Sequence, residues 1–156
     1  MKNLILLIGI ALLITGCAPT YQKSGFWGGG YDEMKMQDNI FKITFEGNTH
    51  TSGQIAEDFG LLRCAETTLE NGYNYFIIEK SKTEERTSTH TTPTEIERTS
   101  SISEEYIVTG GETHTSTKPT VAIIIECFKE KPENVSGIIY DAEQIKTNIK
   151  NKYKIE

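Results

Sequence analysis

Two cysteines in the body of the chain, Cys64 and Cys127, carry its most reactive side chains. In an oxidising compartment an even pair of cysteines could form a disulfide. At about 100° per residue, a helix over residues 52–71 places Cys64 almost opposite the apolar stripe that we expect to face a sheet. That placement favours the alternative of two small buried free thiols, because a disulfide needs Cα atoms within about 7 Å. No histidine lies near either cysteine in sequence, so a catalytic thiol is not indicated.

His90 and His114 are the candidates for metal ligation. Each lies between two threonines, and the two Thr-His-Thr segments mirror one another about residues 101–103. A hairpin would bring the imidazoles together, with Glu95 and Glu112 nearby. Zinc and copper sites need three or four ligands in a fixed geometry. The pair is therefore a weak candidate, and we expect two solvated polar side chains, no metal and no other cofactor.

No other group of residues indicates catalysis. Glu84-Glu85 and Glu104-Glu105 are adjacent acids in polar segments, not two carboxyls facing each other across a cleft. Gly28-Gly29-Gly30 precedes no helical pattern, as a phosphate-binding loop would, and no serine nucleophile motif is present. The sequence therefore predicts no catalytic residue.

The first seventeen residues have the organisation of an export signal. Lys2 is followed by 11 apolar residues, Leu4 to Ile14, and then by Thr15-Gly16-Cys17. A membrane-spanning helix needs about 20 residues, so this run suits a signal-peptide core. The ending resembles the lipobox of bacterial lipoproteins, in which the cysteine is acylated and becomes the mature N-terminus. The alternative is an ordinary secretory signal that contains a cysteine.

A lipobox implies that lipid on Cys17 anchors the chain to a membrane. Lipoproteins of this type usually carry three acyl chains, and two or more hold a protein stably. Ala18, and not Asp, follows the cysteine, which under the common Gram-negative sorting rule favours the outer membrane, facing the periplasm. We expect residues 1–16 to be the signal peptide and residues 17–37 a glycine-rich tether. The Phe26-Trp27 pair is expected to fold back onto the domain rather than lie at the membrane interface.

Charge and length limit the partners. The chain carries a net charge of −6, and removal of residues 1–16 would take away one lysine and no acid, leaving −7. An acidic domain is repelled by phosphate backbones, so nucleic acid is not an expected partner, and anionic lipid is a poor match. The remaining length suits one domain with one core, which we place at residues 38–156.

Apolar patterning predicts an α+β fold. Residues 39–46 alternate like a half-buried strand, and the apolar segments 73–80 and 121–128 are expected to be central strands. Residues 52–71 read as a helix that Thr51 or Ser52 caps and Asn71-Gly72 ends. Asp141 with Gln144 resembles a capping box and begins a last helix, expected to pack on the same sheet. The prediction is a small antiparallel sheet with two helices on one face.

Residues 81–120 differ in composition from the flanking strands. Ser and Thr make up 18 of these 40 residues. The segment is either a disordered polar insertion or a long β-hairpin that extends both strands. We favour the hairpin, because a register that pairs His90 with His114 also pairs Ile77 with Cys127. Gly110-Gly111 would then be a bulge or kink, and residues 93–105 a loose tip.

Several short motifs, taken in their order along this chain, resemble a family of small uncharacterised lipoproteins of Gram-negative bacteria. That resemblance implies an exported lipid anchor and a compact α+β domain, but no activity or substrate. The hairpin is longer and richer in Thr than the family pattern, and Cys64 stands where a small residue such as Ala is typical. The matching motifs are Thr20-Tyr21-Gln22, Gly29-Gly30-Tyr31, Asp38-Asn39-Ile40-Phe41, Phe45-Glu46-Gly47-Asn48, Leu61-Leu62-Arg63-Cys64-Ala65-Glu66, Gly72-Tyr73-Asn74-Tyr75-Phe76 and Tyr140-Asp141-Ala142.

Three functions follow in order of preference. The first is a non-enzymatic envelope lipoprotein, a binding or structural module whose hairpin at 81–120 contacts an envelope protein or glycan. The second is an envelope stress or redox sensor that uses Cys64 and Cys127. The third and least favoured is an enzyme acting on the cell wall, because no nucleophile, base or metal constellation is evident.

Overall fold

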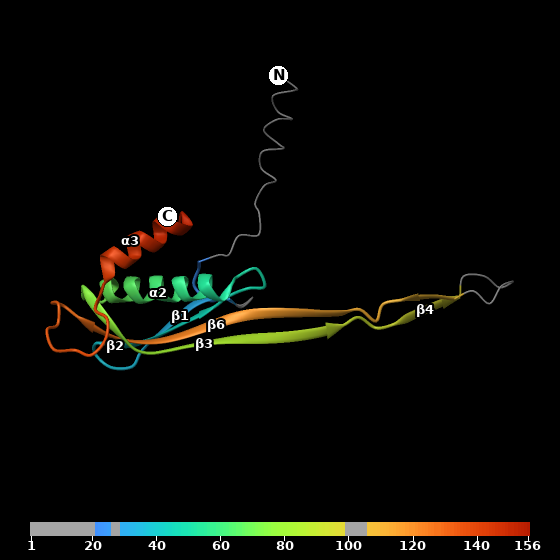
Figure 1. The fold of residues 1–156 in the computed structure, drawn as a ribbon, viewed down its shortest axis with the longest axis horizontal. Coiled ribbons are helices and arrows are strands. Elements are labelled where there is room, and N and C mark those ends of the chain that lie inside the picture. The colour runs from blue at the N-terminus through green and yellow to red at the C-terminus, as the bar shows by residue number, and fades with distance from the viewer. Residues whose placement is uncertain (1–20, 26–28, 99–105) are drawn as a thin grey trace, which may run out of the picture.

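A five-stranded antiparallel sheet and two helices form the body of the protein (Figure 1). The computed structural model describes residues 21–25, 29–98 and 106–156. The strand order in the sheet is β1-β2-β6-β3-β7, and β4 and β5 form a separate pair. The predicted α+β class is confirmed. The elements are β1 (Gly30–Lys35), β2 (Ile40–Glu46), α2 (Gly53–Glu70), β3 (Tyr75–Thr91), β4 (Glu95–Arg98), β5 (Tyr106–Thr109), β6 (Thr113–Phe128), β7 (Tyr140–Asp141) and α3 (Ala142–Tyr153).

Both helices lie on the same side of the sheet, but as successive layers (Figure 1). The N-cap hydroxyl of Ser52 accepts a hydrogen bond from Ile55 N and starts α2, as expected. The carboxylate of Asp141 caps α3 by accepting from Gln144 N. The expectation that α3 packs on the sheet is wrong, since it packs mainly on α2 and meets the sheet chiefly at β7. α2 already covers the apolar sheet face, so α3 buries its own stripe against the outer side of α2.

Phe59 of α2 joins these layers. Its ring makes edge-on contacts with Phe45 of β2 at 5.4 Å, with Tyr153 of α3 at 5.1 Å and with Tyr21 at 5.4 Å between centroids. The next residue, Gly60, lets α2 approach β6 closely, because a Cβ there would lie 3.2 Å from Ile123 Cδ1. The core therefore depends on one aromatic ring that touches the sheet, the second helix and the N-terminal segment.

The expected tether ends earlier than residue 37. Gly30–Lys35 is β1, an edge strand that pairs with β2 throughout, from Gly30 with Glu46 to Lys35 with Phe41. Lys23 forms a parallel bridge with Tyr31, and Tyr21 packs against the core. After Gly30 and the half-buried Tyr31, the residues of β1 are all exposed, so the sequence carries no alternating apolar pattern that would mark this segment as a strand. Phe26 and Trp27 lie outside the described residues.

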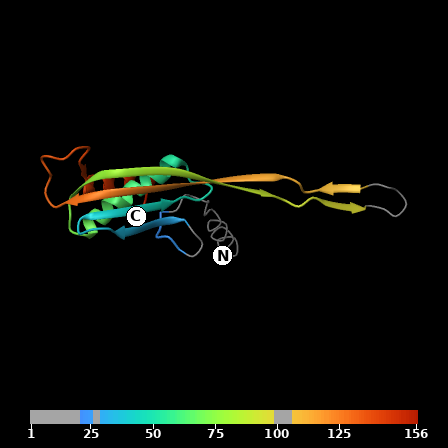
Figure 2. The same cartoon turned by 90° about the horizontal axis from the view of Figure 1, so that it is seen from below.

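The predicted hairpin is formed over the described residues 81–98 and 106–120. β3 and β6 continue out of the body as a two-stranded ribbon that extends well past the helices (Figures 1 and 2). Strand β2 ends at the pair Glu46–Thr120, and one further backbone hydrogen bond runs from Gly47 N to Pro119 O at 2.8 Å. Apart from this bond, residues 85–91 and 113–119 pair only with each other among the described residues. We call these two segments the ribbon.

The predicted register is correct in the ribbon and wrong in the body. His90 pairs with His114, as expected, but Cys127 pairs with Phe76 and not with Ile77. A β-bulge between Ile78 and Lys80 adds one residue, Glu79, to β3 and shifts the register by one position. The prediction assumed one continuous register between the two strands, and such a register cannot include an extra residue in one of them.

The distal end of the hairpin is more regular than expected. Gly110 and Gly111 form the predicted kink, both with positive φ, and a Cβ on Gly110 would meet the Pro93 carbonyl oxygen. Beyond it, β4 pairs with β5, so the strands continue past residue 93, where we expected a loose tip. Residues 99–105, including Glu104-Glu105, lie outside the described residues.

Replacement of Phe59 tests the junction of the layers. We expect Phe59→Ala to lower the free energy of unfolding by about 3–5 kcal/mol, because it leaves a cavity bordered by three elements. Ile138→Ala is the control, since Ile138 is 69% exposed and its removal should change stability by less than about 0.5 kcal/mol. Chemical denaturation of both variants measures the difference, and equal stabilities would contradict the proposed junction.

Candidate functional site

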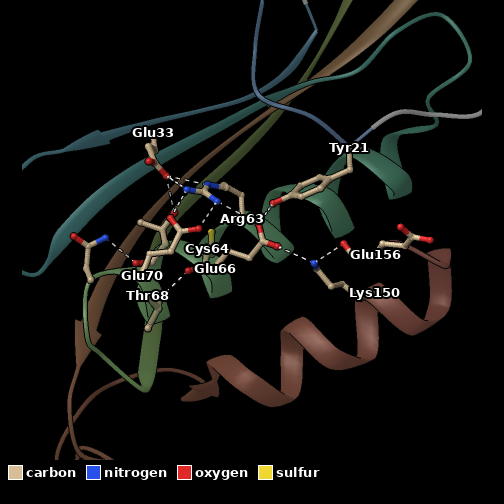
Figure 3. A network of polar contacts seen from close by, with 11 residues as sticks. Tyr21, Glu33, Arg63, Cys64, Glu66, Thr68, Glu70, Lys150 and Glu156 are labelled. Carbon is tan, nitrogen blue, oxygen red and sulfur yellow. Dashed lines mark hydrogen bonds and ion pairs between the residues drawn. The ribbon is translucent and has the colours of Figure 1, made fainter.

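A buried arginine organises the polar side chains between β1 and the helices (Figure 3). The Arg63 side chain is 7% exposed. Its Nη2 donates to Glu33 Oε2 and to Glu70 Oε2, both at 2.6 Å, and its Nη1 donates to Glu66 Oε2 at 3.2 Å. The Tyr31 ring covers the guanidinium carbon at 4.6 Å. We call Arg63, its three carboxylates and Tyr31 the Arg63 network.

The network also holds the N-terminal segment. Tyr21 donates its hydroxyl hydrogen to Glu66, and its ring packs on Tyr31 at 5.0 Å. Lys150 of α3 lies 3.6 Å from the other oxygen of Glu66. Through these contacts Tyr21, the first described residue after the expected anchor at Cys17, is connected to β1, α2 and α3.

Burial and hydrogen bonds shift the pKa values of Glu33, Arg63 and Tyr21. Burial opposes the ionised form of Glu33, but hydrogen bonds from Arg63 and Thr67 outweigh it and hold its pKa below 4.5. Burial likewise opposes the charge on Arg63, and its bonds to Glu70 and Glu33 raise the pKa of the guanidinium nonetheless. Burial, with the bond to Glu66, raises the pKa of Tyr21. Arg63 therefore stays charged, and its donors are already used by carboxylates.

An open hollow of about 370 Å³ borders the network. Lys146, Lys150, Glu66 and Glu70 place charges of both signs along it, and Tyr21 and Leu69 add apolar surface. Because Arg63 is saturated by its own carboxylates, the hollow lacks a free buried cation for an anionic ligand. We interpret the network as a structural lock for the N-terminal segment.

The two body cysteines lie together in the core. Cys64 and Cys127 are 0% and 1% exposed and are free thiols in the structure. Gly60, Cys64 and Thr68 are spaced by four residues on α2, and both Gly60 and Thr68 contact β6, the latter through Cys127 Sγ at 3.4 Å. Cys64 therefore faces the sheet, and the expectation that it faces away is wrong. The stripe containing Phe59 lies along the side of α2, where Phe59 contacts Phe45 of β2 as well as Tyr153 of α3 and Tyr21.

Burial raises the pKa of both thiols, and the charge of Cys127 adds to the effect at Cys64. A thiol with a raised pKa is a poor nucleophile at neutral pH. The disulfide stays the less favoured alternative to two free thiols, and the labelling experiment below distinguishes the two.

His90 and His114 meet across the ribbon as predicted, and both are exposed. Glu112 lies 3.6 Å from His114. Within the described ranges, no group of three or more His, Cys, Asp or Glu side chains is placed to hold a metal ion. Cys17 lies outside the described residues, and no helix in the described part is long and apolar enough to cross a membrane.

The ribbon is the most exposed regular structure in the described chain. Within it, residues 87–91 read Thr-Ser-Thr-His-Thr and residues 113–117 read the same sequence backwards. Antiparallel pairing therefore sets Thr against Thr, Ser against Ser and His against His. We call this paired stretch the threonine segment. Its three threonine pairs share the sheet face that α2 covers in the body, because they continue the alternation of Val121 and Ile123.

Sequence reasoning missed Arg63, Glu33, Glu66 and Glu70 as a unit. Glu66 and Glu70 follow Arg63 by three and seven residues, a spacing that places all three on one helix face. That signal was present, but Glu33 lies 30 residues upstream on another element.

Comparison with protein-family models, curated proteins and solved structures found no match. The resemblance to small Gram-negative lipoproteins therefore stays a prediction.

Loss of the buried cation tests the lock. We expect Arg63→Met to lower the free energy of unfolding at pH 7 by about 3 kcal/mol, because three carboxylates lose their counter-ion. In the wild type, the stabilising contribution of Glu33 is present above pH 4.5 and is lost as the pH falls through its lower folded pKa. In the variant, protonation relieves repulsion, so the difference from wild type should shrink between pH 7 and 4. Exposed Arg86→Met is the control, and a pH-independent difference would contradict the network.

Thiol labelling tests the state of the cysteines. In folded protein we expect less than a tenth of Cys64 and Cys127 to react with iodoacetamide at pH 8, because both are buried and their pKa values are raised. Both should react after denaturation without reductant. Labelling that requires a reductant as well as denaturant would instead establish the disulfide, and rapid labelling in the native state would favour a redox sensor.

Proposed function

We propose that this protein is a lipoprotein of the bacterial envelope, anchored through Cys17, whose ribbon binds an extended strand of a protein partner. The observation that carries the proposal is the threonine segment. It is a regular paired β-structure, exposed to solvent on both faces, and it lies outside the reach of β2. An extended polypeptide binds such an edge by continuing its backbone hydrogen bonds.

The side chains favour strand addition over a glycan. Natural edge strands are protected by charged residues, prolines or bulges. In the body, β3 has such protection, with the bulge at Glu79 and charges at Lys80, Lys82, Glu84 and Glu85. Residues 87–91 and 113–117 contain no Lys, Arg, Asp, Glu or Pro. No Phe, Trp or Tyr occurs in residues 79–94 or 110–120, so the ribbon offers no ring on which a sugar could stack.

The lock supports a short link to the membrane. Tyr21, held by Glu66, follows Cys17 by four positions, and a chain spans at most about 3.6 Å per residue. The domain would therefore lie within roughly 14 Å of the acylated residue. The ribbon then supplies the reach that a long tether would otherwise provide, and it carries the binding edge away from the body.

Two hairpin replacements test the function in cells. The first replaces residues 87–117 with Asn-Gly, a two-residue turn between the paired residues Arg86 and Lys118. The second replaces residues 92–112 with Asn-Gly between Thr91 and Thr113, which keeps the threonine segment and removes the distal hairpin. We expect crosslinking in intact cells to recover a protein partner with the wild type and the second variant, and at least tenfold less with the first.

Both variants should keep the thermal unfolding of the wild type, since neither touches the core. Cys17→Ser should move the protein out of the membrane fraction. A partner retained without residues 87–117 would overturn the proposal, and a partner lost in both variants would place the contact in the distal hairpin. A Cys17→Ser protein that stays in the membrane fraction would contradict the anchor.

A further inference from the structure

The two edges of the threonine segment differ in the space beside them. Along β6, the outer edge is followed by Pro119, which has no N–H, and then by β2, which pairs with β6 from Thr120 onward. On the outer edge of β3, opposite to β6, the only described neighbouring strand is β7, which pairs with Tyr75 and Phe76. The outer edge of β3 is therefore clear of described strands from Ile77 to Thr91 (Figure 2).

The palindrome indicates which strand suits this edge. Strand β3 already pairs with a reversed copy of its own sequence, 87–91 against 113–117, so the structure itself contains the pairing of this sequence with its mirror. A second copy of β3 that approaches in the opposite direction presents Thr, His, Thr, Ser and Thr to positions 87 to 91, so the three threonine positions again meet threonines, while serine and histidine exchange places. With Thr89 opposite Thr89, Thr87 meets Thr91 and Ser88 meets His90, so no two like charges of Lys, Arg, Asp or Glu face each other.

We infer that the outer edge of β3 at residues 87–91 is a homodimer interface, in which two ribbons pair antiparallel about Thr89. This inference rests on the proposed function, because it names a second copy of the chain as the partner strand at the same edge. The two ribbons then form a four-stranded sheet with the bodies at opposite ends. The open length of β3 lets the partner ribbon pass without meeting β2.

The side chains of this dimer reinforce one another. All three threonines of each segment strand lie on one face, so the four strands carry twelve threonines on a single surface. Threonine is β-branched and stiff at χ1, which lowers the entropy lost on pairing. Cross-strand threonine pairs also add contacts, as in the hydroxyl pairs Thr87–Thr117 at 3.4 Å and Thr91–Thr113 at 3.2 Å.

Thr89 and Thr115 provide a matched test. They pair with each other in the monomer, so a substitution at either has nearly the same local environment. In the dimer, Thr89 lies opposite its own copy, while the two Thr115 residues are three strand spacings, or about 14 Å, apart. A disulfide needs Cα atoms within about 7 Å. Oxidised full-length Thr89→Cys in native membranes should form a covalent dimer, and Thr115→Cys should form at least tenfold less.

A second pair of variants measures the equilibrium without a crosslink. Thr89→Lys sets two ammonium groups opposite each other and should weaken dimerisation of the full chain in detergent at least tenfold, by analytical ultracentrifugation. Thr115→Lys should leave it within a factor of three. Equal crosslinking at the two positions, or a wild-type protein that is monomeric at micromolar concentration, would overturn the dimer. Loss of a different protein with residues 87–117, without Thr89 crosslinking, would overturn the dimer while leaving strand addition in place.

Discussion

The guanidinium of Arg63 is a positive charge placed where water is largely excluded, and the surrounding structure follows from that placement. A buried charge costs several kcal/mol unless ionic and hydrogen-bonding partners surround it. Glu33 reaches Arg63 from β1, while Glu66 and Glu70 reach it from α2 itself. Removing β1 from the sheet would therefore strip the arginine of one carboxylate and of the Tyr31 ring together. The edge strand is held by charge as well as by its backbone ladder.

This requirement extends to both ends of the described chain. Glu66 serves Arg63, accepts from Tyr21 and lies beside Lys150, so one carboxylate connects the N-terminal segment, the central helix and α3. The Phe59 ring makes the matching apolar connection among the same elements. A polar link and an apolar link that join the same parts hinder separate movement of any one of them. The ribbon consequently extends from a rigid base, because its two strands continue β6, the central strand of that base, and β3, which pairs with β6.

The sequence predicted the parts of the fold that depend on local patterning. The alternation of Phe41, Ile43 and Phe45, the Ser52 and Asp141 caps and the pairing of His90 with His114 all follow from residues close in sequence or symmetric about a turn. The errors lie where distant residues decide. The bulge at Glu79 reverses which β3 side chains face inward, and no composition signal marks it.

Of the two candidate features, the sequence predicted the ribbon and missed the Arg63 network. The reason is again that the network depends on residues that are distant in sequence. Compositional contrast identified residues 81–120, since Ser and Thr replace the large apolar residues of the flanking strands. The Arg63 network escaped because an arginine on a helix is ordinarily exposed, and only the fold brings Glu33 and Tyr31 over it. Likewise, the direction in which Cys64 points depended on which face of α2 meets the sheet. Gly60 lies on the face that meets β6, where a Cβ would crowd Ile123 at 3.2 Å.

A single strand, β3, shows both ways of treating an edge. Between Ile78 and Arg86 it carries a bulge and a run of charged residues, which discourage another strand from pairing there. From Thr87 to Thr91 the same strand is regular, uncharged and exposed. The bulge and the charged residues therefore protect the edge of β3 within the body. Residues 87–91, which lie beyond the body where a partner has room to approach, lack both. An unprotected edge ordinarily carries a risk of aggregation. The change in edge chemistry within one strand is the feature that a binding function accounts for and that stability alone does not.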